Sequence, residues 1–311
     1  MTRKLYILSG VLSVLIIINV FFIFSFPKER TERTGNAETN LNNTQAYIFP
    51  ISEPSYLPIL NTVVEKPQLA ARSALVYDAK TSRHLYFKNS SERLPVASLT
   101  KLLSAVIVLE NLDTNAVVRV PQKAIKVDDE KQTLYLDENI KVADLLKMML
   151  IESSNDAAYA LMYYAFDNGL NFVGLMNKKA VELGMNDSIF HDSAGLNDDA
   201  LSTAEDLIKL VKYSFKFSEL WSILGEKNAV VYSADGKISH QVNGTNQLLG
   251  IIPDIVGGKT GYTDTALGSL ILVVDVPGKN DKLISIVLSS TERFTDTEKL
   301  INWIKKAYSW Q

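Results

Sequence analysis

Apolar residues recur three or four positions apart through most of the middle of the chain, which is the spacing of one face of an α-helix. One of these stretches is closed by Gly184, a residue typical of helix ends. The pattern predicts helices over residues 98–112, 141–153, 155–166, 172–184, 202–215 and 295–310.

Toward both ends of the compact part, the pattern changes to short runs rich in β-branched and aromatic residues, which favour strands. Residues 73–89 predict two strands around a turn, and residues 267–278 with 281–290 predict a hairpin. Shorter strands are expected at residues 116–120, 228–233 and 237–242. The order indicates an α/β protein of the α+β type: a sheet built from the two chain ends, covered by helices, with a helical insertion.

The N-terminus carries one long apolar run. Residues 5–26 are uncharged and follow Arg3 and Lys4. At about 1.5 Å per residue a helix of this length crosses a bilayer core of roughly 30 Å. A cleaved signal peptide is the alternative, but it has a shorter apolar core and a small-residue cleavage site, which this run lacks. We therefore expect residues 1–27 to be an uncleaved membrane anchor.

Residues 28–68 are polar and then proline-bearing, without helical or strand periodicity, and predict a tether. A compact domain is expected over residues 69–311. Basic residues on the two sides of the apolar run offset each other, so charge alone does not fix the orientation of the anchor. Placing the domain outside the cytoplasm depends on the chemistry below.

Composition excludes several classes of function. The net charge of −3 argues against a general nucleic-acid binder. The absence of cysteine excludes disulfides, thiol catalysis and thiolate metal sites. His84, His191 and His240 are scattered without a metal-binding spacing, so neither a metal nor another cofactor is expected. No G-x-S-x-G motif indicates an α/β-hydrolase triad.

Ser98 and Lys101 stand at the start of a strongly apolar helix, where a lysine is costly to bury. Residues three apart share a helix face, so the two side chains can touch. The first helical turn stabilises a serine oxyanion, and a desolvated lysine can act as a base. The S-x-x-K pattern is weak alone: Ser25 and Lys28 also match, but they lie at the membrane edge around a proline.

Two further motifs follow in order. Ser153 and Asn155 form an S-x-N triplet between two predicted helices, where a loop is expected. Lys259, Thr260 and Gly261 form a K-T-G triplet that is flanked by glycine and enters a predicted strand. The three motifs together are a much stronger signal than any one of them.

With these motifs the sequence resembles the D-alanyl-D-alanine carboxypeptidases, low-molecular-mass penicillin-binding proteins that act on peptidoglycan. The resemblance covers roughly residues 70–308 and includes "RLPVASLTKLLSA", "LLKMMLIESSNDAAYALM" and "GGKTGYTDTALGSLILVV". It implies the penicillin-binding/β-lactamase-like transpeptidase fold, with an antiparallel sheet from both chain ends, flanking helices and a helical subdomain.

The resemblance also implies the catalytic roles. Ser98 would attack the D-Ala-D-Ala carbonyl, Lys101 would take the serine's proton, and Ser153, near Lys259, would relay a proton to the leaving amine.

The same resemblance implies the residues that bind substrate. Asn155 would hold the substrate amide, and Lys259 with Thr260 would bind the terminal carboxylate. The backbone N–H groups of Ser98 and Tyr262 would form the oxyanion hole. At Gly261 a side chain could obstruct a substrate lying along the strand edge.

Each motif also has a structural interpretation. Ser98 could cap its helix while Lys101 stays solvated, the S-x-N residues could cap the next helix, and K-T-G could be a plain turn. We interpret Asp156 as a residue of the helix start. Ser202 is expected to be a cap, in a capping box with Glu205.

Other functions on the same scaffold are a class A-like β-lactamase, a peptidoglycan D,D-endopeptidase and a non-catalytic wall-binding module. Glu182 begins "ELGMN", close to the E-x-x-L-N of class A β-lactamases, but we interpret it as a surface helix residue. The chain ends soon after its last helix, without the C-terminal β domain and amphipathic anchor of many carboxypeptidases, which leaves the choice between exo- and endopeptidase open.

The sequence therefore predicts a serine D,D-carboxypeptidase held at a bacterial cell membrane by one N-terminal span, with its domain outside the cytoplasm. Its expected partners are stem peptides ending in D-Ala-D-Ala, and β-lactams as covalent inhibitors at Ser98.

Overall fold

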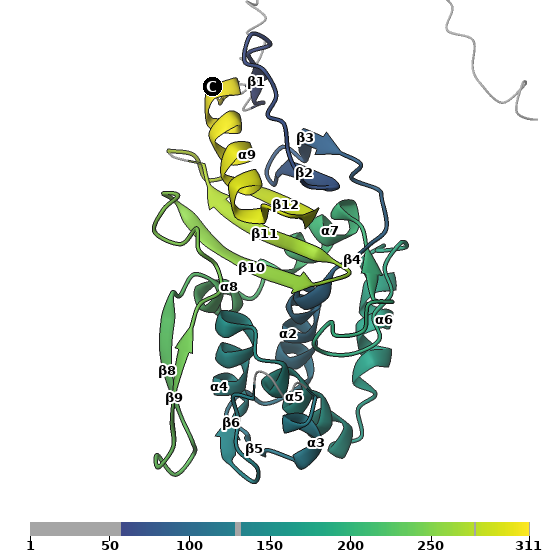
Figure 1. Cartoon of the computed structure of the whole chain (residues 1–311), viewed down its shortest axis with the longest axis vertical. Coiled ribbons are helices and arrows are strands. Elements are labelled where there is room, and N and C mark those ends of the chain that lie inside the picture. The colour runs from purple at the N-terminus through teal and green to yellow at the C-terminus, as the bar shows by residue number, and fades with distance from the viewer. Residues whose placement is uncertain (1–56, 128–131, 277, 311) are drawn as a thin grey trace, which may run out of the picture. The chain divides into compact units, whose positions relative to one another are not determined.

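The computed structural model describes residues 57–127, 132–276 and 278–310 (Figure 1). The expected membrane anchor at residues 1–27 lies outside these residues, as does the tether up to residue 56. Within the described ranges, no helix has both the length and the apolarity needed to cross a membrane.

A five-stranded antiparallel sheet forms the centre of the domain (Figure 1). Its strand order is β10-β11-β12-β2-β3, so strands from both ends of the chain lie side by side, as predicted. The strands are β2 (Ser73–Asp78), β3 (Arg83–Lys88), β10 (Ile255–Thr263), β11 (Leu267–Asp275) and β12 (Lys282–Ser290). β2, β11 and β12 are buried along nearly their whole length, because both faces of the sheet are covered. The predicted α+β fold is confirmed.

Helix α9 (Arg293–Ala307) covers one face of the sheet. Its apolar side packs against strand residues that include Val76, Val287 and Leu270. The chain then forms β13 (Tyr308–Ser309), which pairs with β1 (Ile59–Leu60). The last part of the expected tether thus contains a strand of the domain, a pairing between distant residues that local periodicity does not reveal.

The helical part packs against the other face (Figure 1). Its central helix, α2 (Thr100–Asn111), has nine buried residues. A helix that is apolar on all sides belongs in a core, which explains its position. The surrounding helices are α3 (Gln122–Ile125), α4 (Val142–Lys147), α5 (Asn155–Asp167), α6 (Phe172–Glu182), α7 (Ala204–Ser214) and α8 (Ser218–Leu224).

Two helical turns and three pairs of short strands complete the helical part. A 3₁₀ turn, η1 (Ala97–Leu99), precedes α2, and a π-helical turn, η2 (Met148–Glu152), continues α4. The paired strands are β4 (Leu94–Pro95) with β7 (Leu201–Ser202), β5 (Val117–Arg119) with β6 (Asn139–Lys141), and β8 (Asn228–Tyr232) with β9 (Ser239–Asn243).

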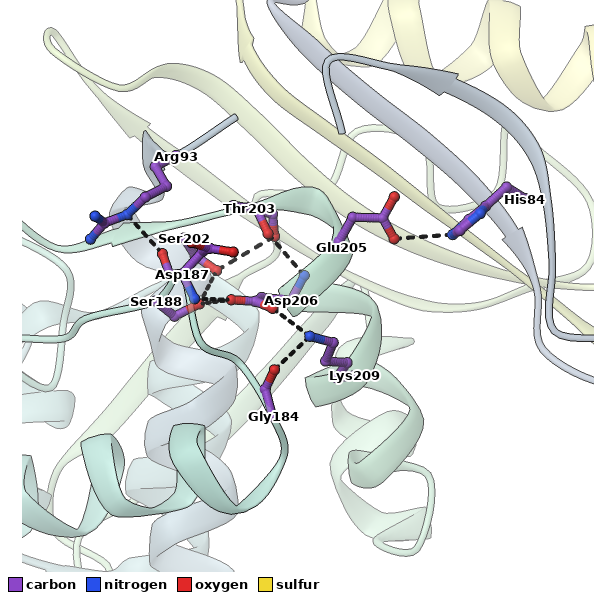
Figure 2. Close-up of polar contacts among 10 residues, drawn as sticks. All are labelled: His84, Arg93, Gly184, Asp187, Ser188, Ser202, Thr203, Glu205, Asp206 and Lys209. Atoms are coloured by element: carbon purple, nitrogen blue, oxygen red, sulfur yellow. Dashed lines mark hydrogen bonds and ion pairs between the residues drawn. The ribbon is translucent and has the colours of Figure 1, made fainter. Parts of the chain in front are cut away.

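The cap of α7 differs from the prediction (Figure 2). Thr203 is the N-cap, and its Oγ1 accepts a hydrogen bond from the Asp206 backbone N–H at 3.0 Å. Ser202 instead lies in β7, and its hydroxyl contacts that of Ser188 at 2.7 Å. The predicted capping box is therefore wrong, because pairing of β7 with β4 draws Ser202 into a strand one residue before the cap.

Candidate active site

Ser98 lies in η1, at the entrance to α2. The N-cap positions of η1 and α2 are Val96 and Leu99, and neither makes a side-chain cap. Ser98 is therefore not the capping residue that the structural interpretation required. Lys101 is not solvated either, because its side chain is completely buried.

Lys101 is surrounded by oxygen atoms. Its Nζ lies 2.9 Å from Ser98 Oγ, as the spacing of the two residues predicted. It also donates to Asn155 Oδ1 at 2.7 Å and to the Ala194 carbonyl at 2.8 Å. Ser98 of the first motif and Asn155 of the second motif thus both contact the buried Nζ of Lys101.

The loop that supplies the Ala194 carbonyl is organised by Asp192. This buried carboxylate accepts hydrogen bonds from the backbone N–H groups of residues 194–197. The sequence analysis assigned no role to Asp192 or to Ala194. The signal in the sequence was an aspartate followed by three small residues, a composition that suits a carboxylate-centred turn.

At Gly195 this loop packs closely against η1, the turn that carries Ser98. A Cβ atom at Gly195 would stand 1.9 Å from the Ala97 carbonyl oxygen, and its φ of +76° is in the left-handed region. Ala97 itself has a φ of 46°, which is unusual for a residue with a side chain. The turn that carries Ser98 is therefore held in a strained conformation by close backbone packing.

The S-x-N motif forms a tight turn between η2 and α5. Ser153 ends η2 with φ 66° and ψ 30°, again left-handed. The cap of α5 is Ser154, whose Oγ accepts from the Ala157 N–H at 3.1 Å. Ser153 is thus not the cap of α5, and Asn155 is already the first residue of that helix. Single π-helical turns such as η2 are frequent at functional sites.

The K-T-G motif lies in β10, the edge strand of the sheet. Lys259 is completely buried, and its Nζ donates to Ser153 Oγ at 2.8 Å and to the Thr260 carbonyl at 2.9 Å. Burial lowers the pKa of Lys259 well below its usual value, and the nearby charges of Lys101 and Arg293 lower it further.

Gly261 has a structural role in addition to the one expected from the sequence. A Cβ atom there would lie 2.9 Å from the Val96 carbonyl and 3.3 Å from the backbone nitrogens of Ser98 and Leu99. A side chain would therefore push β10 away from the serine turn, besides any effect on substrate. Gly261 brings the backbone of β10 next to the backbone N–H of Ser98.

Arg293 adds a third cation that the sequence analysis missed. Its Nη1 lies 3.4 Å from the Gly261 carbonyl, and its guanidinium lies 5.8 Å from the centre of the exposed Tyr262 ring. Burial lowers its pKa. A cation at the first position of a helix opposes the helix dipole, and that conflict was the available signal.

Other candidates lie apart from this network. The Glu182 carboxylate, 46% exposed, pairs with Lys179 at 2.9 Å, which fits a surface helix residue. His84 pairs with Glu205 and His240 with Glu138. In the part of the chain that the structure describes, no three metal-ligating side chains come together.

Two buried lysines, each hydrogen-bonded to a serine hydroxyl between an antiparallel sheet and a helical part, are typical of serine peptidases of the penicillin-binding class. The family described as D-alanyl-D-alanine carboxypeptidase matches residues 60–292. The chain belongs to this family of serine peptidases, which confirms the resemblance seen in the sequence.

Two curated relatives bear different activities in their names. The D-alanyl-D-alanine carboxypeptidase DacF of Bacillus subtilis is 30% identical over 76% of this chain and 63% of that protein. The match thus spans less than two thirds of the relative. A D-alanyl-D-alanine endopeptidase of Haemophilus influenzae is 35% identical over 71% of this chain and 76% of its own length.

A solved structure shares the fold. Penicillin-binding protein D2 from Listeria monocytogenes, in a cefotaxime-bound form, is 31% identical with a TM-score of 0.66. The likeness covers 78% of this chain and 99% of that one.

Proposed function

We propose that this protein is a serine D,D-carboxypeptidase that removes the terminal D-alanine from peptidoglycan stem peptides. The observation that carries the proposal is the arrangement of oxygen atoms around the buried Lys101 nitrogen. The proposed roles rest on Ser98, Lys101, Ser153, Asn155 and Lys259.

Lys101 acts as the general base. The base is the deprotonated form of Lys101, whose amine has two N–H donors and one lone pair; the protonated form carries the charge that, in addition to burial, lowers the pKa of Lys259. The Asn155 amide oxygen and the Ala194 carbonyl can only accept, so they use the two donors. The lone pair is left for the third neighbour, the Ser98 hydroxyl at 2.9 Å, whose proton it can take.

The reaction then has two halves. Ser98 Oγ bonds to the carbonyl carbon of the penultimate D-alanine as its proton passes to Lys101. The C–N bond breaks, and the departing amine receives that proton from Lys101 by way of Ser153, which lies 2.8 Å from Lys259 Nζ. Water next attacks the ester and gives a proton to Lys101, which is neutral again. Lys101 returns this proton to Ser98 Oγ as the ester C–O bond breaks and the shortened peptide leaves.

Separate groups of the protein bind the terminal carboxylate, the reacting carbonyl and the amide of the substrate. Lys259 and Thr260 place hydrogen-bond donors at β10, and the guanidinium of Arg293 adds positive charge there, which suits a terminal carboxylate. The backbone N–H groups of Ser98 and Tyr262 form the oxyanion hole, supported by the close approach of β10 to the serine turn at Gly261. Asn155 also holds the substrate amide.

β-Lactams acylate the same serine. The structure of the Listeria protein is of a cefotaxime-bound form, and that protein shares the fold. We infer that penicillins, as mimics of D-Ala-D-Ala, form an ester with Ser98.

The domain works outside the cytoplasm of a bacterial cell, where its substrate lies. Residues 1–27 are a single N-terminal membrane anchor, a proposal supported by the uncharged run of residues 5–26.

A D,D-endopeptidase is the second candidate, because the Haemophilus relative bears that name and is 35% identical. Both activities use the same acyl-enzyme on Ser98. They differ in whether the amine that leaves is free D-alanine or a cross-linked peptide.

One experiment tests both candidates. The full chain is incubated with a stem pentapeptide and, separately, with a cross-linked dimer, and D-alanine and monomer are measured. Release of D-alanine by wild type and not by Ser98→Ala supports the carboxypeptidase. Cleavage of the dimer alone would replace it with the endopeptidase, and release of D-alanine by Ser98→Ala would refute the role of Ser98.

A further inference from the structure

Thr245 lies outside the three motifs, yet it contacts the K-T-G strand and the helical turn that precedes the S-x-N motif. It stands in the connection between β9 and β10. Its backbone N–H donates to the Ile151 carbonyl at 3.1 Å, in the turn just before Ser153. Its hydroxyl lies 2.6 Å from that of Thr260 in the K-T-G strand. The residue therefore bridges η2 and β10.

The protons of these two hydroxyl groups can be counted. Each hydroxyl has one proton to donate and can also accept. Thr260 can donate either to Thr245 or to a ligand, but not to both. If Thr260 donates to a ligand, the short contact of 2.6 Å persists as a hydrogen bond only when Thr245 is the donor.

The geometry allows Thr245 to be that donor. Its other acceptor is the Ile151 carbonyl, at 3.5 Å from Oγ1. That distance is far beyond the roughly 2.7–2.8 Å of a good O–H···O bond, whereas the contact with Thr260 is short. Donation to Thr260 is the favoured use of the Thr245 proton once a ligand accepts from Thr260.

We propose that Thr245 is a positioning residue that donates its proton to Thr260 and so directs the Thr260 proton to the terminal carboxylate of the substrate. The inference rests on the proposed function, in which Thr260 binds that carboxylate. The link between Thr245 and Ile151 is made by backbone atoms, so it survives a change of side chain. The hydroxyl can thus be removed while the bridge stays.

The test is a double-mutant cycle. Thr245→Val keeps the β-branched shape and removes the hydroxyl, and Thr245→Ser restores a hydroxyl without the methyl group. Thr260→Val and the double variant complete the cycle. For each full-length protein, D-alanine release from a stem pentapeptide gives kcat and KM, and intact mass gives the rate of acylation by benzylpenicillin over seconds to hours.

A hydrogen bond to a charged group corresponds to about a tenfold effect or more. We expect Thr245→Val to lower kcat/KM about tenfold, mainly through KM, and Thr245→Ser to recover most of it. In the Thr260→Val background, removal of the Thr245 hydroxyl should cost less than about twofold, since its target is gone.

Two results would overturn the proposal: unchanged kinetics in Thr245→Val, or a loss of the same size with and without Thr260. If Thr245→Val does not fold, as judged by its melting temperature, Thr245→Ala replaces it in the cycle. Failure of the proposed function is distinguishable, because wild type itself would then release no D-alanine.

Discussion

Glu152 precedes Ser153 and is a partly buried carboxylate in an unfavourable environment. Its Oε1 is buried and has no hydrogen-bond partner among the described residues. Its pKa is raised from 4.5 to about 7, mainly by burial and in smaller part by the charge of Asp156. His240 and the backbone N–H of Asn243 oppose these effects. The folded protein thus holds a proton here that the unfolded chain releases.

The sign of the effect on stability follows from this shift. The pKa of Glu152 is higher in the folded state than in the unfolded chain. The protonated side chain therefore stabilises the fold fully below about pH 4.5, and this stabilisation is lost as pH rises through about 7. At about 1.36 kcal/mol per pKa unit, the shift corresponds to roughly 3 kcal/mol. Solvent screening at this partly exposed group reduces the expected effect to about 1 kcal/mol.

The assay compares wild type with Glu152→Gln in thermal unfolding at pH 5 and pH 8. The neutral amide cannot ionise, so the Tm of the variant minus that of wild type should be about 2–4 °C larger at pH 8 than at pH 5. Glu65→Gln, at an exposed position, controls for the loss of one acidic side chain. A difference in Tm between Glu152→Gln and wild type that does not change with pH would refute the reasoning.

Three further predictions concern the site. Lys101→Ala should slow acylation by benzylpenicillin by about 10²–10⁴-fold while unfolding cooperatively; acylation at the wild-type rate would contradict its role as base. The free energy of unfolding of Gly195→Ala, measured in urea, should be lower by about 2 kcal/mol or more, because its Cβ would overlap the Ala97 carbonyl. An unchanged midpoint would show that the contact relaxes freely. Arg293→Ala should raise KM for the stem peptide about tenfold with little change in kcat, and an unchanged KM would remove it from carboxylate binding.

Much of the site was predictable because its residues are close in sequence within each motif. The contact between Ser98 and Lys101 follows from helix periodicity, and it holds although Ser98 lies in a 3₁₀ turn. The contact between Lys259 and Ser153 joins two motifs far apart in the chain, and only the resemblance to a family indicated it.

The missed residues act over long distances or through the backbone. The Ala194 carbonyl carries no side-chain signal, and Asp192 acts by folding its own loop. Thr245 reaches the site only after β9 and β10 are placed. Likewise, Ser202 fits a capping box locally, but pairing of β7 with β4 moves the cap to Thr203.

The central claim is an activated serine at position 98, and intact mass of the full chain after addition of benzylpenicillin tests it most directly. The account predicts one covalent adduct per chain, located on Ser98 by peptide mapping and absent in Ser98→Ala. A folded protein without an adduct, or an adduct that persists in Ser98→Ala, would contradict it.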